Sequence, residues 1–236
     1  NFTDADYVYS VNPRIIKNPK PVLMATYREM RELSYAGFNV YQEEALLPVY
    51  KAGIPVNVRN ANNPGCPGTV IVSNRESKAG DVRVAGIACD SGFTSIYISK
   101  YLMNREIGFG RRLLSILEDE RLSYEHSPTG IDDLTLIVRT SELENGKLAR
   151  MIGRIKNELD VDDVKVENGL CLIVVVGEGM KRAIGVAAMA TKALSDAGIN
   201  IEMISQGSSE VSMIFAVEED KCKIGVRALY EAFFNE

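Results

Sequence analysis

The sequence predicts a mixed α/β (α+β) chain whose second half is one folding unit used twice. Residues 108–138 align without a gap with residues 185–215, which lie 77 positions later. Upstream, the apolar run TSIYISK (94–100) falls at the same offset on CLIVVVG (171–177). Each copy therefore reads strand, loop, helix, strand, turn, strand, and a duplication of this kind is typical of a binding module.

The composition limits the classes of protein to which the chain can belong. With 236 residues, of which 46% are hydrophobic, the chain is long enough for two or three domains. No apolar run approaches the ~20 residues that cross a bilayer, and a net charge of -5 argues against a nucleic-acid surface. We therefore expect a cytoplasmic protein that binds small molecules, with neither a nucleic acid nor a membrane as partner. The four cysteines have no metal-ligand spacing, so no metal site is predicted.

Residues 1–74 have the pattern of an α/β segment. A strand-like start precedes two amphipathic helices that each end at a glycine, and two strands joined by a Pro/Gly-rich turn follow. The helices are expected at 27–36 and 42–51, the strands at 54–60 and 69–74, and the turn at 62–68. A polar linker is expected at 75–81, a first repeated region at 82–160 and a second at 161–236.

The prediction of ligand binding rests on the turn before each repeated helix. A glycine at this turn, Gly108 or Gly185, lets a ligand approach the main chain, and the free N–H groups of the first helical turn favour an anion. Glu125, on the strand that follows the first helix, could hold an ammonium group. An anion-binding turn facing a carboxylate suits a free amino acid. The alternative is that both glycines only close the helix–strand packing and Glu125 is a solvated strand residue.

Six motifs resemble those of aspartate kinases. The runs VVVGEGM, SDAGINIEMISQGSSEVSMIFAV and LYEAFF resemble the paired ACT domains of these enzymes, and TDADYVYSVNPR, GFNVYQEEAL and GIPVNVRNANNPGCPGT resemble the end of their kinase domain. The resemblance covers essentially the whole chain. It implies the C-terminal fragment of an amino-acid-kinase α/β domain followed by two ferredoxin-like βαββαβ ACT modules. It also implies that the strand at 82–90 joins the second module.

The activity that the resemblance implies is ATP-dependent phosphorylation of L-aspartate to 4-phospho-L-aspartate, with ATP and Mg²⁺ as cofactors. This is the first step toward lysine, threonine, methionine and isoleucine. Asn12 stands where the family usually has Asp, and Asn39 where it often has Lys. By match to the family motif, the residues expected at the ATP site are Thr3, Asp4, Tyr9, Ser10, Asn12, Arg14 and Asn39.

The catalytic half of the family's kinase domain is not found in the sequence. Its KFGG strand with the catalytic lysine and its Gly/Ser-rich aspartate-binding motif are missing, and no nucleophile elbow or phosphate-cradling Gly-Lys-Ser/Thr run replaces them. The single histidine, His126, is interpreted as a packing residue. No catalytic residue is therefore assigned, and we expect this polypeptide alone to be an inactive regulatory fragment.

For feedback regulation, the resemblance implies an effector in the first ACT module and a homodimer through the ACT domains. Lysine is favoured over threonine as the effector. The alternatives are a non-catalytic amino-acid-sensing subunit and, less favoured because of the kinase-like segment, an ACT-bearing regulator of a dehydrogenase or dehydratase. The expected effector-binding residues are Met103, Asn104, Glu106, Gly108, Phe109, Gly110, Tyr124, Glu125, Thr129, Gly130 and Ile131.

Overall fold

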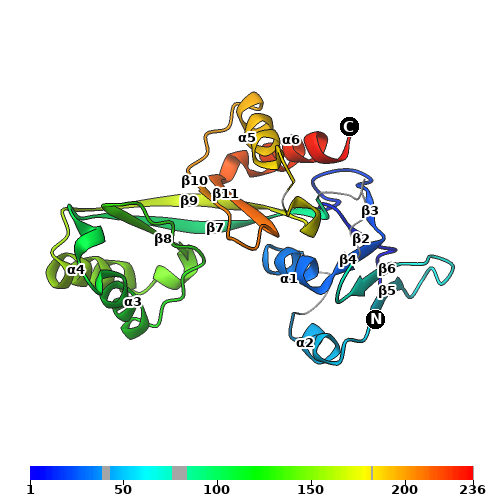
Figure 1. Cartoon of the computed structure of the whole chain (residues 1–236), viewed down its shortest axis with the longest axis horizontal. Coiled ribbons are helices and arrows are strands. Elements are labelled where there is room, and N and C mark those ends of the chain that lie inside the picture. The colour runs from blue at the N-terminus through cyan, green and yellow to red at the C-terminus, as the bar shows by residue number, and fades with distance from the viewer. Residues whose placement is uncertain (39–42, 76–83, 182, 236) are drawn as a thin grey trace. The chain divides into compact units, whose positions relative to one another are not determined.

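The computed structural model describes residues 1–38, 43–75, 84–181 and 183–235 (Figure 1). The chain forms two compact units, one made of Asn1–Asp90 with Leu172–Glu236 and the other of Ser91–Cys171. They are called unit 1 and unit 2. From residue 76 on, the linker predicted at 75–81 lies outside the described residues. No helix in the described part of the chain is long and apolar enough to span a membrane.

The kinase-like part of unit 1 is a small mixed sheet with two helices. The sheet has the order β1-β5-β6-β4, in which β1 and β5 are parallel, β5 and β6 antiparallel, and β4 and β6 parallel. Helix α1 begins at a capping box, because Thr26 accepts from the Glu29 N–H while the Glu29 carboxylate accepts from the Thr26 N–H. The bounds are β1 Phe2–Thr3, β2 Val8–Tyr9, β3 Pro21–Val22, β4 Met24–Thr26, α1 Tyr27–Tyr35, α2 Glu43–Ala52, β5 Val56–Asn60 and β6 Thr69–Val72.

Two helices and a sheet complete unit 1. Within this unit the strands have the order β10-β11-β9-β7, and helices α5 and α6 pack on each other (Figure 1). The bounds are β7 Gly86–Ser99, β9 Asp163–Val176, η3 Glu178–Met180, α5 Val186–Asp196, β10 Met203–Ser205, β11 Ser212–Glu218, η4 Glu219–Lys221 and α6 Cys222–Phe234. Residues up to Asp90 of β7 and from Leu172 of β9 belong to this unit.

Unit 2 holds the remaining parts of β7 and β9 together with β8, in the order β9-β7-β8. Helices α3 and α4 pack on each other and, with the inward side chains of the strands, form one apolar core. Along β8 the side chains alternate, so that Leu134, Leu136 and Val138 are buried in this core. The bounds are η1 Met103–Arg105, α3 Phe109–Asp119, β8 Asp133–Arg139, η2 Thr140–Leu143 and α4 Lys147–Leu159.

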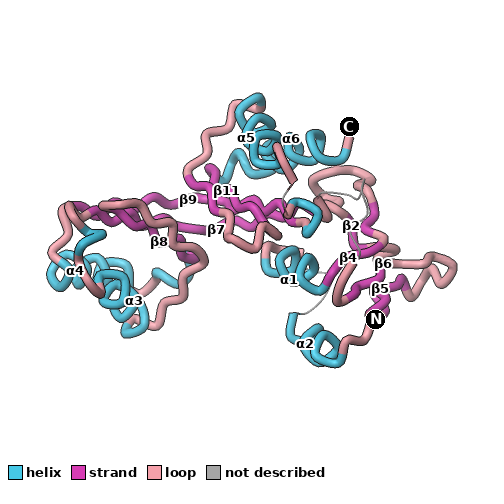
Figure 2. Tube along the Cα trace, viewed as in Figure 1, coloured by secondary structure: helices cyan, strands magenta, loops and turns pink. Residues whose placement is uncertain are grey.

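The two repeated regions contain the same elements in the same order; Figure 2 colours their helices cyan and their strands magenta. Strands β7 and β9 start 77 residues apart, at Gly86 and Asp163, and so do helices α3 and α5. The next strands, β8 and β11, start at Asp133 and Ser212, which is 79 residues. The gap-free alignment is therefore wrong beyond the helix, where the second copy has two extra residues. Because side chains alternate with a period of two, this shift leaves the buried face of the strand unchanged.

Candidate nucleotide and effector sites

A cavity of about 400 Å³ lies in unit 1 beside the chain that leads into β2 and the loop that follows it. Four of the seven residues that were predicted to bind ATP line this cavity. Gly37 lies in its wall at φ +109°, and a Cβ there would come within 2.9 Å of the Cys89 carbonyl oxygen, so the position requires glycine. The lining residues are Asp4, Ala5, Tyr7, Tyr9, Val11, Asn12, Pro13, Arg14, Gly37 and Phe38.

Asn12 shapes the turn that presents Arg14 to this cavity. The Arg14 N–H donates to the Asn12 side-chain oxygen at 2.9 Å, and the Ile15 N–H donates to the Asn12 carbonyl at 2.8 Å. An asparagine can therefore make the turn where the family usually has an aspartate. Arg14 is exposed, and its guanidinium has no hydrogen bond or ion pair among the described residues. Its permanent positive charge is available for an anion.

Two tyrosines form the aromatic part of the wall. The rings of Tyr7 and Tyr9 meet edge to face, with their centroids 6.3 Å apart. Burial raises the pKa of Tyr9, and the negative charge of Asp6 raises it further. The pKa of Tyr7 is also raised, chiefly by its hydrogen bond with Cys66. Both phenols therefore stay protonated at neutral pH and can act as donors.

The other three predicted ATP residues do not line the cavity. Thr3 lies in β1, and its hydroxyl donates to the Asp4 carboxylate at 3.3 Å. Ser10 is buried, and its N–H and hydroxyl both donate to the Lys20 carbonyl, at 3.0 and 2.9 Å. Asn39 lies outside the described residues. Ser10 therefore stabilises the loop and does not line the cavity.

The predicted effector residues of unit 2 start at the turn before α3. Gly108 is the N-cap of this helix at φ +82°, a conformation that favours glycine. Before it, the Glu106 carboxylate pairs with Lys100 at 2.8 Å and with Arg112. Glu106 therefore has two cationic partners, which hold the turn in place. The sequence pattern did not single out either cation.

Glu125 has a partner in unit 2 as well. Its carboxylate lies 3.2 Å from the Arg139 Nε, and its side chain is 9% exposed. Its N–H donates to the Ile137 carbonyl at 2.8 Å, which ties this segment to β8. His126, the next residue, forms an isolated antiparallel β-bridge with Ile137 of β8. Arg139 stands at the end of β8, fourteen residues after Glu125, where no local spacing rule pairs them.

The remaining effector candidates divide into core and surface residues. Met103 and Phe109 are buried in the apolar core of unit 2. Gly110 is half-buried in the first turn of α3. The Gly130 N–H donates to the Asp133 carbonyl at 2.9 Å. The surface residues of the set are Asn104, Gly108, Tyr124, Thr129, Gly130 and Ile131.

Comparison with known proteins shows which proteins the chain resembles. The ACT domain family matches residues 173–233. Aspartokinase 3 of Bacillus subtilis is 57% identical over 234 residues, which are 99% of this chain and 51% of that protein. Along 99% of its length the chain is therefore similar to the aspartokinases. It spans about half the length of the curated relatives that it matches.

Solved aspartokinases share its fold. The aspartate kinase of Clostridium acetobutylicum superposes with a TM-score of 0.93 at 40% identity, over 99% of this chain and 53% of that one. Aspartokinase III of E. coli, in complex with lysine and aspartate, superposes with a TM-score of 0.78 at 24% identity, over 99% and 51%. The chain thus has a mixed α/β fold with ferredoxin-like ACT modules, and it matches the corresponding region of solved aspartokinases.

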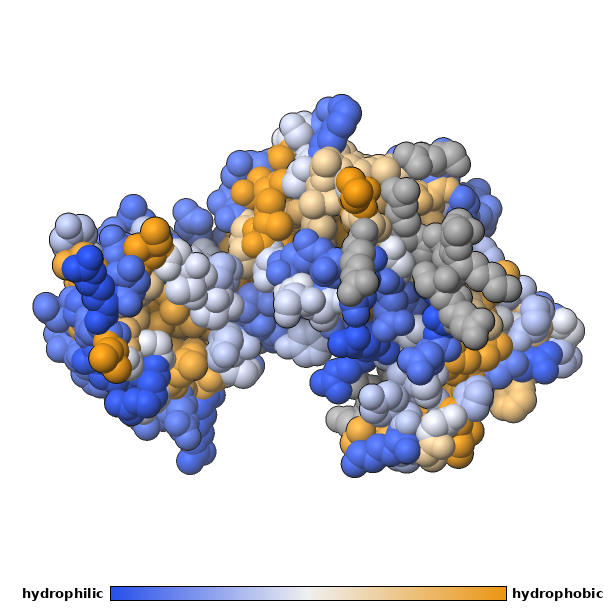
Figure 3. Space-filling model, viewed as in Figure 1, coloured by the Kyte–Doolittle hydropathy of each residue, from blue (hydrophilic) through white to orange (hydrophobic). Residues whose placement is uncertain are grey.

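The second ACT module has a cavity at the turn of Gly185, where the sequence indicated that a ligand could approach the main chain. It measures about 670 Å³ and adjoins the N-terminus of α5 at Gly185, the repeat partner of Gly108. Figure 3 shows apolar surface over the helices of this module. None of the residues that line the cavity was predicted to bind an effector, because every predicted effector residue lies in the first module. Its lining residues are Met180, Ala183, Gly185, Val186, Ala187, Ala188, Gln206, Gly207, Ser208, Glu210 and Met213.

Proposed function

We propose that this chain completes the nucleotide site of an aspartate kinase and carries its regulatory modules. The full protein would transfer a phosphoryl group from ATP to L-aspartate and form 4-phospho-L-aspartate in the cytoplasm. One observation carries the proposal: Asp4, Tyr9, Asn12 and Arg14 gather around one cavity in a chain that is 57% identical to an aspartokinase along 99% of its length.

The cavity residues fit a nucleotide chemically. Phosphoryl transfer requires positioning and charge neutralisation rather than covalent chemistry by the protein. Arg14 would supply fixed positive charge to the phosphates, and the wall at Tyr7 and Tyr9 would supply an aromatic surface and hydroxyl donors. Bound Mg²⁺ would neutralise further phosphate charge in the full enzyme.

Calorimetric titration of the chain with ATP and Mg²⁺ tests this proposal. Replacing Arg14 by Ala removes a charge-assisted contact worth roughly 1.5 to 3 kcal/mol, so Arg14→Ala should weaken ATP binding about tenfold or more. The matched control is Lys17→Ala, which removes an exposed cation of the same loop and should change affinity less than about twofold. A wild-type chain that does not bind ATP–Mg²⁺, or equal losses in both variants, would contradict the proposal.

For regulation, we propose a free amino acid, lysine, as the effector of the first ACT module. The N–H groups of the first turn of α3, at Gly108, suit an α-carboxylate. The ammonium group would share the Glu125 carboxylate with Arg139, since a carboxylate offers about four acceptor positions. The E. coli relative that was solved in complex with lysine supports this choice of effector. We also propose a homodimer formed through the ACT modules.

A further inference from the structure

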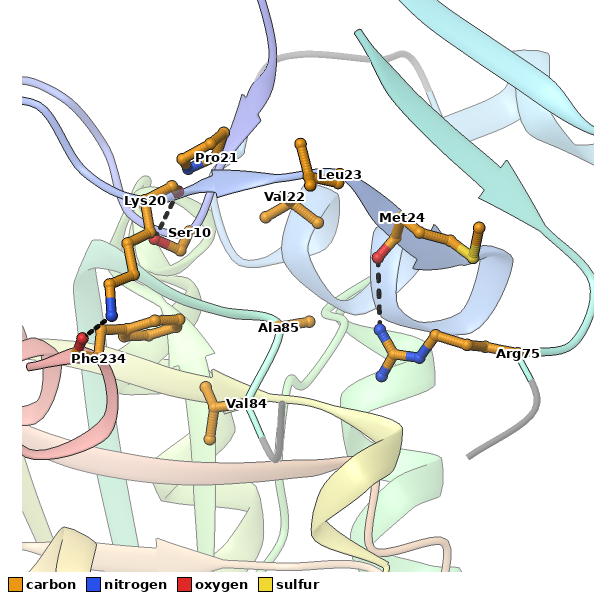
Figure 4. A pocket seen from close by; sticks show the side chains of 10 residues that line it. All are labelled: Ser10, Lys20, Pro21, Val22, Leu23, Met24, Arg75, Val84, Ala85 and Phe234. Carbon is orange, nitrogen blue, oxygen red and sulfur yellow. Dashed lines mark hydrogen bonds between the residues drawn. The ribbon is translucent and has the colours of Figure 1, made fainter. Parts of the chain in front are cut away.

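The loop that carries Arg14 is closed at its base by Ser10 and Lys20. It joins β2 to β3, which pair antiparallel, with Tyr9 opposite Pro21. The Ser10 N–H and hydroxyl both donate to the Lys20 carbonyl, and Figure 4 shows the hydroxyl contact. These bonds fix the two ends of the loop. They do not fix the nine residues between them, which include Asn12 and Arg14.

Helix α6 of the second ACT module is hydrogen-bonded to this loop. The Lys20 N–H donates to the Tyr230 hydroxyl at 3.0 Å, and its ammonium group donates to the Phe234 carbonyl (Figure 4). The Arg227 Nε donates to the carbonyl of Ile15, the residue after Arg14, at 3.3 Å. All of these residues belong to unit 1.

The sequence of α6 explains why one helix can make these contacts. Arg227, Tyr230 and Phe234 are spaced i, i+3, i+7, which places them on one face of the helix. The rings of Tyr230 and Phe234 are buried and stacked, with their centroids 5.0 Å apart, so the Tyr230 hydroxyl is held in place. Phe234 is in the last turn, where carbonyl groups lack helical partners and the helix dipole favours a cation such as Lys20.

We infer that α6 is a positioning element for the nucleotide loop, with Tyr230 and Arg227 as the positioning residues that act through Arg14. Two anchors along the loop, at Ile15 and Lys20, restrict the conformations from which Arg14 meets the phosphates. The second ACT module is then structurally part of the nucleotide site. This inference rests on the proposed nucleotide function.

Tyr230→Phe tests the inference because it removes one hydroxyl and keeps the stacked ring. Hydrogen exchange of the loop at residues 10–20 should become faster, and calorimetry should show ATP–Mg²⁺ affinity reduced roughly three- to tenfold. Tyr101→Phe is the matched control, since Tyr101 is 74% exposed; it should alter neither quantity. Arg227→Gln, at an exposed position, should act in the same direction as Tyr230→Phe.

A double-mutant cycle separates positioning from a general loss of structure. If Tyr230 acts through Arg14, Tyr230→Phe should change ATP affinity less than about twofold in an Arg14→Ala background. Equal losses in both backgrounds, or unchanged loop exchange in Tyr230→Phe, would overturn the inference. A wild-type chain that fails to bind ATP–Mg²⁺ would contradict the proposed function, while the exchange experiment would still decide whether α6 anchors the loop.

Discussion

The buried carboxylate of Glu29 accepts a hydrogen bond at 2.9 Å from the backbone N–H of Glu178, a residue 149 positions later in the chain. The same carboxylate caps α1 through the Thr26 N–H and pairs with Arg75 at 3.2 Å. It is fully buried. One side chain of the kinase-like segment therefore connects the start of its own helix to the turn that precedes α5 in the second ACT module.

Replacing Glu29 by glutamine should destabilise the chain. The amide keeps an acceptor but loses the charge that compensates Arg75, so we expect a loss of about 2 to 3 kcal/mol in the free energy of unfolding of unit 1. Unfolding in a chemical denaturant measures this loss of free energy. The control is Glu32→Gln on the same helix, where the Glu32 carboxylate has no partner among the described residues; this change should cost less than about 0.5 kcal/mol. Equal stability of the two variants would contradict the role given to Glu29.

Lysine binding should depend on Glu125. Glu125→Ala removes the carboxylate proposed for the ammonium group and should weaken binding by about one to two orders of magnitude, since a charge-assisted hydrogen bond contributes roughly 1.5 to 3 kcal/mol. Glu202→Ala, at the repeat partner, should change affinity little. Calorimetric titration of both variants with lysine measures the two affinities. If threonine binds and lysine does not, the effector assignment is wrong, and if Glu202 is the sensitive residue, the site is wrong.

The ion pair of Glu125 with Arg139 requires its own control. Arg139→Met breaks the pair but keeps the carboxylate, so lysine affinity should stay the same or rise if the carboxylate binds the ammonium group. A loss as large as that of Glu125→Ala would show that the pair only maintains the fold of unit 2.

The polypeptide as it stands should not phosphorylate aspartate. The family's catalytic lysine strand and aspartate-binding motif have no counterpart among its 236 residues, so no part of it is predicted to bind aspartate, the second substrate. A hydroxamate assay for aspartyl phosphate should give no turnover above a sample purified in the same way without the chain. Turnover that co-purifies with the chain would contradict this expectation.

The chain should form dimers through its ACT modules. Ile107 and Ile184, at equivalent places in the two copies, are 99% and 94% exposed, and a partner surface would cover such side chains. Sedimentation should show a dimer at tens of micromolar. Lysine at both positions should weaken it, whereas Ile54→Lys in the kinase-like segment, where Ile54 is 53% exposed, should not. A wild-type monomer, or equal effects of both changes, would count against the proposed interface.

Two helix glycines should respond in opposite ways to alanine. A Cβ at Gly225, in α6, would lie 2.7 Å from the Ile173 Cδ1 and 3.2 Å from the Leu194 Cδ2. Overpacking costs about 1 to 3 kcal/mol, so Gly225→Ala should destabilise unit 1 despite a gain in helix propensity. At Gly153, in α4, nothing lies within 4 Å of the new Cβ, so Gly153→Ala should stabilise unit 2 by about 0.5 to 1 kcal/mol. Thermal unfolding of both variants checks the signs.

The cavity residues near the N-terminus could be predicted from the sequence because they are close together in it. Asp4, Tyr9, Asn12 and Arg14 fall within eleven residues, and the turn at Asn12 depends on hydrogen bonds between near neighbours. Ser10 belongs to the same motif, yet it faces Lys20 rather than the cavity. The motif indicated which segment lines the cavity, and the folding of the loop determined which of its side chains reach it.

By itself the sequence determined the repeat, the helices and the resemblance to aspartokinases, because periodicity, caps and motifs are local properties of the chain. Only the tertiary structure decided which polar groups meet: the Glu29 carboxylate with the Glu178 N–H, Glu125 with Arg139, and Lys20 with α6. The gap-free repeat also concealed the two-residue shift between β8 and β11, since a strand keeps its buried face under such a shift. Partners far apart along the chain are set by packing and burial, and no spacing rule encodes them.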